Sequence, residues 1–185
     1  RLNEIARAMG LDWLDRYGGK ISSEWFFPKV WQTLNEAPGV YEAADRFIEA
    51  ADWIVWQMTG QETCINCTAC YKAIWSKQDD FPSKAFLKAL DPRLATVVDE
   101  KIRRGISFLG DRAGGLTEEA AGWTGLYPGT AVAVGNVDAH VSVPAATVTE
   151  PGRMVMILGT SNCHMALSAE ENRVEGICGY VEDGI

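Results

Sequence analysis

Residues Thr130–Leu167 read TAVAVGNVDAHVSVPAATVTEPGRMVMILGTSNCHMAL and carry the strongest fold signal of the chain. This stretch holds two short apolar runs, Ala131–Val134 and Met154–Leu158, and small or polar residues follow each run at once. Short apolar runs bounded by turn residues are typical of buried strands. A third, partly apolar run at Cys163–Leu167 extends the prediction of strands over this part of the chain.

Residues able to do chemistry follow both predicted strands. Asp138 comes shortly after the first, and a carboxylate beyond the carboxyl end of a buried strand commonly faces a crevice. Gly159-Thr160-Ser161 comes directly after the second, where a glycine lets the backbone approach a phosphate and amides and hydroxyls donate to it. We hypothesise that Asp138 is a catalytic base and that Gly159, Thr160 and Ser161 meet a nucleotide phosphate. The alternatives are a turn or N-cap residue at Asp138 and a plain hairpin turn at Gly159–Ser161.

Three further polar residues have mainly structural interpretations. His140 could pair with Asp138, but a lone histidine two residues further along is more often structural. His164 lies in a predicted strand and is expected to be a core or hairpin residue. Lys72, in ACYKAIW, is a cation among apolar neighbours; such a lysine usually extends to solvent, and the alternative is contact with a substrate hydroxyl or phosphate.

The sequence pattern before Gly129 predicts helices, and the pattern after Gly129 predicts strands. The amino-terminal part is therefore expected to be helical and the carboxyl-terminal part α/β. An apolar stripe predicts a long helix over Val40–Met58, which Gly60 caps. By contrast, Cys64–Ala73 lacks a helical period, and Gly110–Gly115 is expected to be a loop. The other expected helices are one from Ile5 through Trp13 that ends at Gly18-Gly19, Ser83–Leu90, a helix from Asp91-Pro92 to Ile102, and a short helix capped by Thr117.

Composition restricts the class of protein. With 185 residues, 47% hydrophobic and 23% charged, the chain is expected to be globular with a buried core. A net charge of -8 argues against nucleic-acid binding, which needs a basic surface. No apolar run is long enough for a membrane span, and 5 cysteines, an odd number, suit the reducing cytoplasm. The chain starts without an initiator Met, so we expect it to be a piece of a longer protein.

Three cysteines are spaced as in a cluster-binding motif. Cys64-x-x-Cys67-x-x-Cys70 opens like an iron–sulfur run, but position 74 is Ile74 instead of the next cysteine. A zinc site would need a distant fourth ligand. The candidate fourth ligands are Cys163, Cys178, His140 and His164. Buried thiols that pack as small apolar residues are the favoured interpretation, and no metal ligand is predicted.

Five blocks of sequence together resemble one known family. They are YGGKISSEW (17–25), FIEAADWIVWQMTG (47–60), CTACYKAIW (67–75), GLYPGTAVAVGNVDAHVSVPAA (125–146) and MILGTSNCHM (156–165). These blocks resemble the FGGY carbohydrate kinases, in the family's order and over essentially the whole chain. Within the family they are most similar to the bacterial ribulokinases. Cys70 stands where these usually have a glycine, and we expect this larger side chain near Lys72 to shift the sugar site.

The resemblance implies an actin-like kinase with two ribonuclease-H-like domains and a cleft between them for sugar and ATP. Residues 1–149 would be the latter part of the amino-terminal sugar-binding domain, and residues 150–185 the opening strands of the ATP-binding domain. The turn Glu150-Pro151-Gly152 marks this boundary. By the same resemblance Asp138 is the catalytic base, Lys72 contacts the sugar, and Gly159, Thr160 and Ser161 lie at the ATP phosphates.

The resemblance also implies an activity: MgATP-dependent phosphorylation of a ketopentose, L-ribulose to L-ribulose 5-phosphate in arabinose catabolism. The alternatives are a sibling kinase for another ketose or polyol, and a non-catalytic sugar-binding relative. The expected partners are the sugar and ATP, with Mg²⁺ as cofactor, and homo-oligomerisation is left open. Because half of the ATP site would be missing, the isolated chain is expected to be inactive.

Overall fold

The computed structural model describes residues 1–102, 105–177 and 179–183. Within these ranges, no helix combines the length and the apolarity needed to cross a membrane. The helices are α1 (Leu2–Ala8), α2 (Phe26–Glu36), α3 (Pro38–Ala43), α4 (Ala50–Thr59), α5 (Asn66–Ala73), α6 (Lys84–Leu90), α7 (Val97–Lys101), α8 (Glu118–Thr124) and α9 (Asp138–Ala145), with short 3-10 helices η1 (Asp12–Tyr17) and η2 (Pro92–Leu94). The strands are β1 (Arg112–Gly115), β2 (Ala131–Ala133), β3 (Met154–Leu158) and β4 (Asn162–Ala166).

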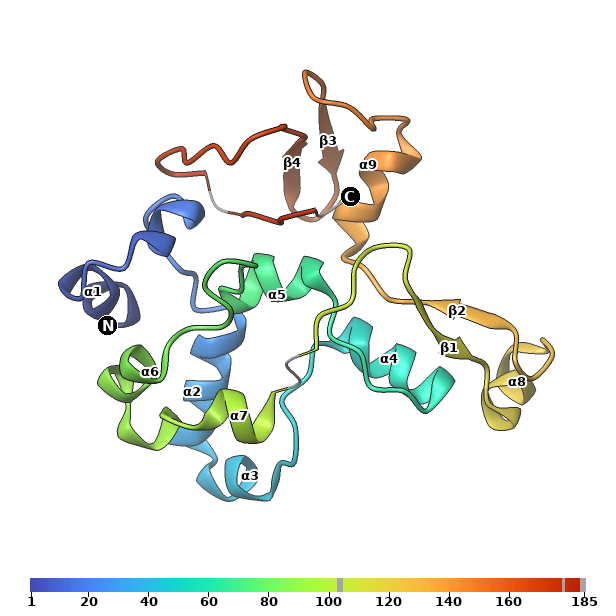
Figure 1. Cartoon of the computed structure of the whole chain (residues 1–185), viewed down its shortest axis with the longest axis horizontal. Helices are drawn as coiled ribbons and strands as arrows, with labels where there is room; N and C mark the ends of the chain where they lie inside the picture. Colours follow the sequence, from blue (N-terminus) through green and yellow to red (C-terminus); the bar gives the residue numbers. More distant parts are fainter. Residues whose placement is uncertain (103–104, 178, 184–185) are drawn as a thin grey trace.

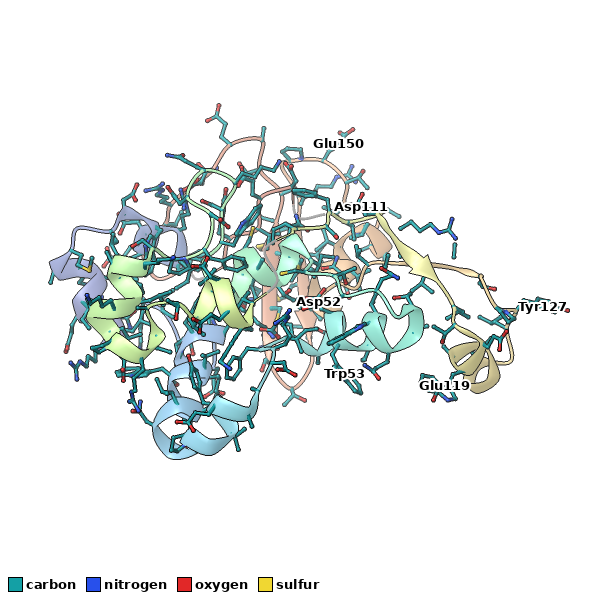
Figure 2. The ribbon with its side chains drawn as sticks, turned by 60° about the horizontal axis from the view of Figure 1, so that its bottom comes forward. Asp52, Trp53, Asp111, Glu119, Tyr127 and Glu150 are labelled. Atoms are coloured by element: carbon teal, nitrogen blue, oxygen red, sulfur yellow. The ribbon has the colours of Figure 1, made fainter. Side chains whose placement is uncertain are left out.

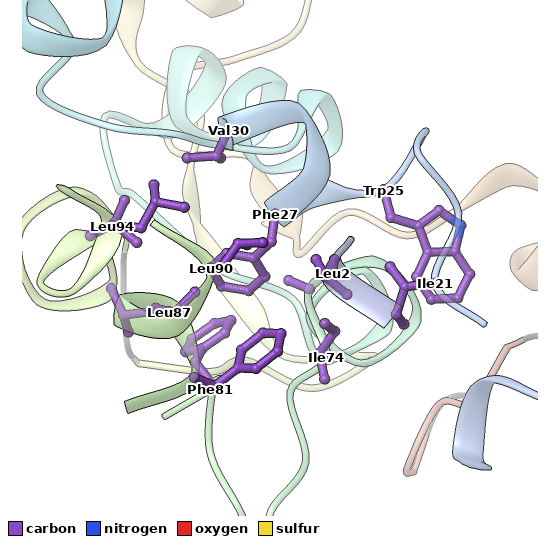
Figure 3. Packing of buried hydrophobic residues seen from close by; sticks show 14 of the residues in the cluster. Leu2, Ile21, Trp25, Phe27, Val30, Ile74, Phe81, Leu87, Leu90 and Leu94 are labelled. Atoms are coloured by element: carbon purple, nitrogen blue, oxygen red, sulfur yellow. The ribbon is translucent and has the colours of Figure 1, made fainter. Parts of the chain in front are cut away.

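The amino-terminal helices form one packed lobe. Helices α1, α2, α3, α6 and α7 surround a core of aliphatic and aromatic side chains (Figures 1 and 3). Phe27 of α2 and Phe86 of α6 are fully buried in this core, and Trp13 meets the Phe86 ring edge-on at 5.2 Å. Aromatic side chains bury large areas, so these rings from η1, α2 and α6 supply much of the packing surface of the lobe.

The strands form two separate antiparallel hairpins. β1 pairs with β2, and β3 pairs with β4 in a register that places Met156 opposite His164. The prediction of strands over 131–134, 154–158 and 163–167 is confirmed, but the prediction that they are buried is wrong. In β3, exposed and half-buried side chains alternate. The hairpin has only two strands, and α9 packs against one of its faces, so the side chains on the other face remain exposed.

The predicted helix over Val40–Met58 is interrupted. The chain is helical in α3 and again in α4, but residues 44–49 between them are not helical. Here the amide of Phe47 donates to the carbonyl of Lys101, and the Phe47 ring lies 5.4 Å from the ring of Tyr41. Tertiary contacts therefore override a helical pattern that is continuous in the sequence. Gly60 caps α4 at φ 69°, as predicted.

Two segments expected to be irregular are regular. Cys64–Ala73, which lacks an apolar period, contains helix α5, and nearly all of its side chains are buried. A helix that is buried all round has no amphipathic stripe to detect. The expected loop Gly110–Gly115 contains strand β1, where a side chain on Gly115 would meet the backbone of Gly129 at 2.9 Å. The close approach of the two strands therefore requires glycine at this position.

Helix ends are predicted better than helix lengths. The Ser83 hydroxyl accepts from the amide of Phe86, and the Thr117 hydroxyl accepts from the amide of Ala120, so both predicted caps are confirmed. The expected first helix instead divides into α1 and η1, and Gly18 ends η1. The expected helix after Asp91-Pro92 divides into η2 and α7, and its apolar side chains Leu94, Val97, Val98 and Ile102 are buried.

The segment after β4 returns to the amino-terminal lobe (Figure 1). The amide of Gly176 donates to the carbonyl of Gly18. Arg16 is buried and forms ion pairs with Asp79 at 2.8 Å and with Glu171 at 3.3 Å. This segment is thus fixed to η1 by both backbone and charged contacts.

Candidate active site

Asp138 is the first residue of α9 and its side chain is exposed. Its Oδ1 accepts from the amide of Ala139 at 2.8 Å, so one carboxylate oxygen is bound locally. Asp138 is therefore a first-turn residue of α9, and Val137 is the N-cap. This position places its carboxylate at the amino end of the helix dipole.

Lys72 lies near the carboxyl end of α5 and is half-buried. Its Nζ lies 3.4 Å from Oε2 of Glu49, the residue that precedes α4. Both side chains line a cavity of about 240 Å³, which has apolar walls from Phe26, Phe47 and Ile48. The ammonium group is thus held at a cavity that combines an apolar wall with charged groups.

A buried contact joins the helix of Lys72 to the helix of Asp138. Sγ of Cys67, in α5, lies 3.1 Å from Nδ1 of His140, in α9. The His140 ring also meets the Tyr71 ring of α5 edge-on at 5.1 Å. α5 and α9 are therefore packed together at the positions adjoining the two predicted site residues.

His140 itself is buried and neutral. Burial is the main reason that the pKa of its imidazole is lowered, and the positive charge of Lys72 lowers this pKa as well. The negative charge of Asp138 acts in the opposite direction. Both predicted site residues thus act electrostatically on one side chain between them. The expectation that His140 is structural agrees with its contacts, and His164 is an exposed residue of the β3–β4 hairpin.

Gly159-Thr160-Ser161 forms the exposed turn between β3 and β4, where the amide of Gly159 donates to the carbonyl of Ser161. A methyl group on Gly159 would meet nothing nearer than this carbonyl at 3.7 Å. α9 packs against the hairpin, and the turn lies at the end where α9 begins (Figure 1). The two hydroxyls of this open turn are able to donate hydrogen bonds to an anionic oxygen.

The cysteine triplet forms no metal centre among the residues that the structure describes. Cys67 and Cys70 are buried within α5, and Cys64 is half-buried before it. Across residues 1–102, 105–177 and 179–183, no three His, Cys, Asp or Glu side chains gather to hold a metal ion. Cys178, a candidate fourth ligand, lies outside the described residues.

Curated proteins of known name match this chain over its full length. The ribulokinase of Geobacillus thermodenitrificans is 60% identical over 184 residues, which cover 100% of this chain and 33% of that protein. The ribulokinase of Mycolicibacterium smegmatis is 52% identical over 186 residues, with the same coverage. Over its full length the chain is therefore similar to ribulokinases. It spans about a third of the length of these relatives. No family model matches it.

A solved structure shows which fold the chain has. The xylulose kinase of Rhodospirillum rubrum superposes with a TM-score of 0.62 over 83% of this chain and 31% of that protein, at 22% identity. At this identity the likeness concerns the fold alone, and it confirms the α/β, actin-like class expected from sequence.

Two acidic residues beside Lys72 and α5 are not predicted from the sequence. Glu49 is the ion-pair partner of Lys72, and Asp52 is buried in α4 with a relative exposure of 2%. Asp52 and the exposed Trp53 lie on different sides of α4 (Figure 2). An acidic residue on the apolar face of a predicted helix is the signal that could have identified Asp52.

Proposed function

We propose that the chain is part of an ATP-dependent kinase that phosphorylates a ketopentose, with L-ribulose as the substrate. The observation that carries this proposal is the 60% identity over the full chain to a protein named ribulokinase. The packing of α5 on α9 supports it, because this packing brings the helices of Lys72 and Asp138 into contact through Cys67 and His140.

In this proposal Asp138 is the catalytic base. Phosphoryl transfer has a loose transition state, so the protein mainly positions the reactants and stabilises charge. An exposed carboxylate can accept the proton of the attacking sugar hydroxyl, and such general base catalysis typically accelerates a reaction by about two to four orders of magnitude. One oxygen of Asp138 is bound to the amide of Ala139, so the second oxygen would take the proton.

Lys72 would bind the sugar. An ammonium group has three donors and can hold more than one hydroxyl oxygen. Its pairing with Glu49 keeps the charge at the edge of the cavity. Cys70 is buried beneath this surface and packs in the core, so its effect on the sugar would act through the position of α5.

The turn at Gly159, Thr160 and Ser161 would hold the phosphates of ATP through its hydroxyls and amides. The space around Gly159 fits the approach of an anionic group. Mg²⁺ bound to ATP would supply charge neutralisation for the transferred phosphate. This ion keeps several water ligands and needs few from protein, so we name no protein ligand for it.

We further propose that residues 1–149 belong to the sugar-binding domain and residues 150–185 to the ATP-binding domain of a cytoplasmic enzyme. Pro151 and Gly152 form a turn between α9 and β3 and support this boundary. The cleft would then lie at the amino end of α9, beside the β3–β4 turn, with sugar and ATP as the partners.

The proposal is tested on the complete kinase with a coupled assay for ADP and a panel of ketopentoses and polyols. L-ribulose should give the highest kcat/KM, and a different preferred sugar would assign a sibling kinase. Asp138→Asn should lower kcat by about 100-fold or more while calorimetric sugar binding changes little. Asp15→Asn, at another exposed aspartate, is the matched control. Near-normal turnover of the Asp138 variant would remove Asp138 as the base, and no ADP formation with any sugar would exclude a kinase.

A further inference from the structure

Helix α4 holds helix α5 at both of its ends. At the carboxyl end of α5, Glu49 pairs with Lys72 at 3.4 Å. At the amino end, the buried carboxylate of Asp52 accepts from the amide of Ile65, the N-cap of α5, at 3.1 Å. The two acidic residues lie at the start of α4, so one turn of this helix contacts both ends of the next.

Asp52 is bound by more than one donor of the α5 segment. Its Oδ1 also accepts from the Thr63 hydroxyl at 3.3 Å, and its Oδ2 accepts from the Thr68 hydroxyl at 3.5 Å. A buried carboxylate is costly unless such donors satisfy it, so these bonds fix the start of α5 relative to α4.

Glu49 is in turn the carboxylate that pairs with Lys72. Two other charged side chains, Glu24 and Lys29, line the same cavity, but they pair with each other at 3.4 Å. Among the ion pairs of the described residues, Lys72 has Glu49 as its sole acidic partner. The side-chain exposures of 34% for Lys72 and 21% for Glu49 leave the ammonium accessible from the cavity.

We propose that Glu49 is a positioning residue that orients Lys72 for sugar binding, and that Asp52 holds in place the helix that carries Lys72. This inference rests on the proposed sugar-binding role of Lys72. Lysine has a long flexible side chain, and ordering it on binding opposes affinity. An ion pair that restricts the side chain before the sugar arrives reduces this cost. Glu49 would thus affect sugar affinity without touching the transferred phosphate.

The test measures steady-state kinetics of the complete kinase with L-ribulose and ATP for Glu49→Gln, Lys72→Met and the double variant. Glu49→Gln should raise KM for the sugar by about 3- to 10-fold, with kcat and KM for ATP within about two-fold of the unsubstituted enzyme. In the Lys72→Met background the same change should have no further effect, because Glu49 acts through Lys72. Glu62→Gln, which breaks a half-buried pair with Arg46 at 3.3 Å, is the matched control and should leave KM unchanged.

Asp52 supplies the second arm. Asp52→Asn keeps an oxygen that accepts from the amide of Ile65, so it should retain sugar affinity, whereas Asp52→Ala should raise KM for the sugar. An unchanged sugar KM in Asp52→Ala would overturn the role of Asp52. Should this variant fail to fold, Thr63→Val, which removes one donor to Asp52, should raise the sugar KM to a smaller extent, and an unchanged KM there would overturn the same role.

The possible failures are distinguishable. An unchanged sugar KM in Lys72→Met removes the proposed role of Lys72 and the positioning role with it. A raised KM in Lys72→Met together with an unchanged KM in Glu49→Gln, or an additive effect in the double variant, overturns the positioning role alone.

Discussion

Sγ of Cys67 and Nδ1 of His140 lie 3.1 Å apart in a buried contact between α5 and α9. Burial raises the pKa of the Cys67 thiol to about 11, and burial likewise lowers the pKa of His140. Both groups are therefore neutral near pH 7, and the protonated thiol has a hydrogen to donate to the ring. This contact couples the helix that carries Lys72 to the helix that begins with Asp138.

Truncating His140 should destabilise the protein. His140→Ala would remove the partner of Cys67, open a cavity beside Tyr71, and lower the free energy of unfolding by about 2–4 kcal/mol. His164→Ala, at the exposed hairpin histidine, should change it by less than about 0.5 kcal/mol. Urea denaturation of both variants measures the difference, and equal effects would show that the His140 contact contributes little.

The buried cysteines should resist alkylation in the folded protein. Burial raises the pKa of Cys70 to about 12 and that of Cys67 to about 11, so their reactive thiolates are scarce near pH 7.5. Iodoacetamide should therefore modify the half-exposed Cys163 in preference to these two, and all three after urea is added. Peptide mass spectrometry reads the labelling, and rapid native labelling of Cys67 would contradict the buried α5.

Asp52 should make stability depend on pH in the acidic range. In the folded protein the pKa of this carboxyl is raised to about 6, mainly by burial. In the unfolded chain the pKa of an aspartate is about 3.9. Between these values the folded state binds more protons, so the contribution of Asp52 falls as pH rises from about 4 to about 6, by up to about 3 kcal/mol. Asp52→Asn has no such proton to lose.

The measurement for Asp52 is urea denaturation of both proteins at a series of pH values. The stability of Asp52→Asn relative to the unsubstituted protein should increase between about pH 4 and pH 6 and stay constant above. A difference that does not vary over this range would show that Asp52 titrates in the folded state as it does in the unfolded chain.

Local signals in the sequence predict the ends of elements well. Ser83 and Thr117 cap helices as expected because their hydroxyls bind amides only a few residues away. The Asp138 and Gly159–Ser161 positions also follow predicted strands as expected, although their roles stay predictions. These signals depend on neighbours in the chain and need no knowledge of the tertiary fold.

What the sequence could not predict depends on contacts between distant residues. The sequence pattern does not predict α5, because a helix with nearly all of its side chains buried has no apolar stripe. The pattern joins α3 and α4 into one helix, because the break between them depends on distant residues: the Phe47 amide donates to the Lys101 carbonyl, and the Arg46 guanidinium donates to the Glu100 carbonyl. The Glu49–Lys72 pair likewise depends on residues that are distant in sequence, and no neighbouring residue distinguishes Glu49 from a solvated glutamate.

Gly18 provides a test of the return of the carboxyl-terminal segment. Its φ is 63°, and a methyl group here would lie 2.7 Å from both the amide nitrogen and the carbonyl oxygen of Ile177. Gly10 has nearly the same φ, 65°, but a methyl group there would meet nothing within 4 Å. Gly10→Ala should therefore cost only the backbone strain of about 1 kcal/mol, whereas Gly18→Ala adds a steric clash with residues 176–177.

The two alanine variants should thus differ in a local observable. Gly18→Ala should displace the segment and weaken the bond from the Gly176 amide to the Gly18 carbonyl, so that hydrogen exchange at residues 168–177 becomes about ten-fold faster or more. Gly10→Ala should leave exchange in this segment unchanged while lowering stability slightly. Equal exchange in the two variants would mean that the segment does not lie against Gly18 in solution, and the ion pair between Arg16 and Glu171 would then have no backbone contact to reinforce it.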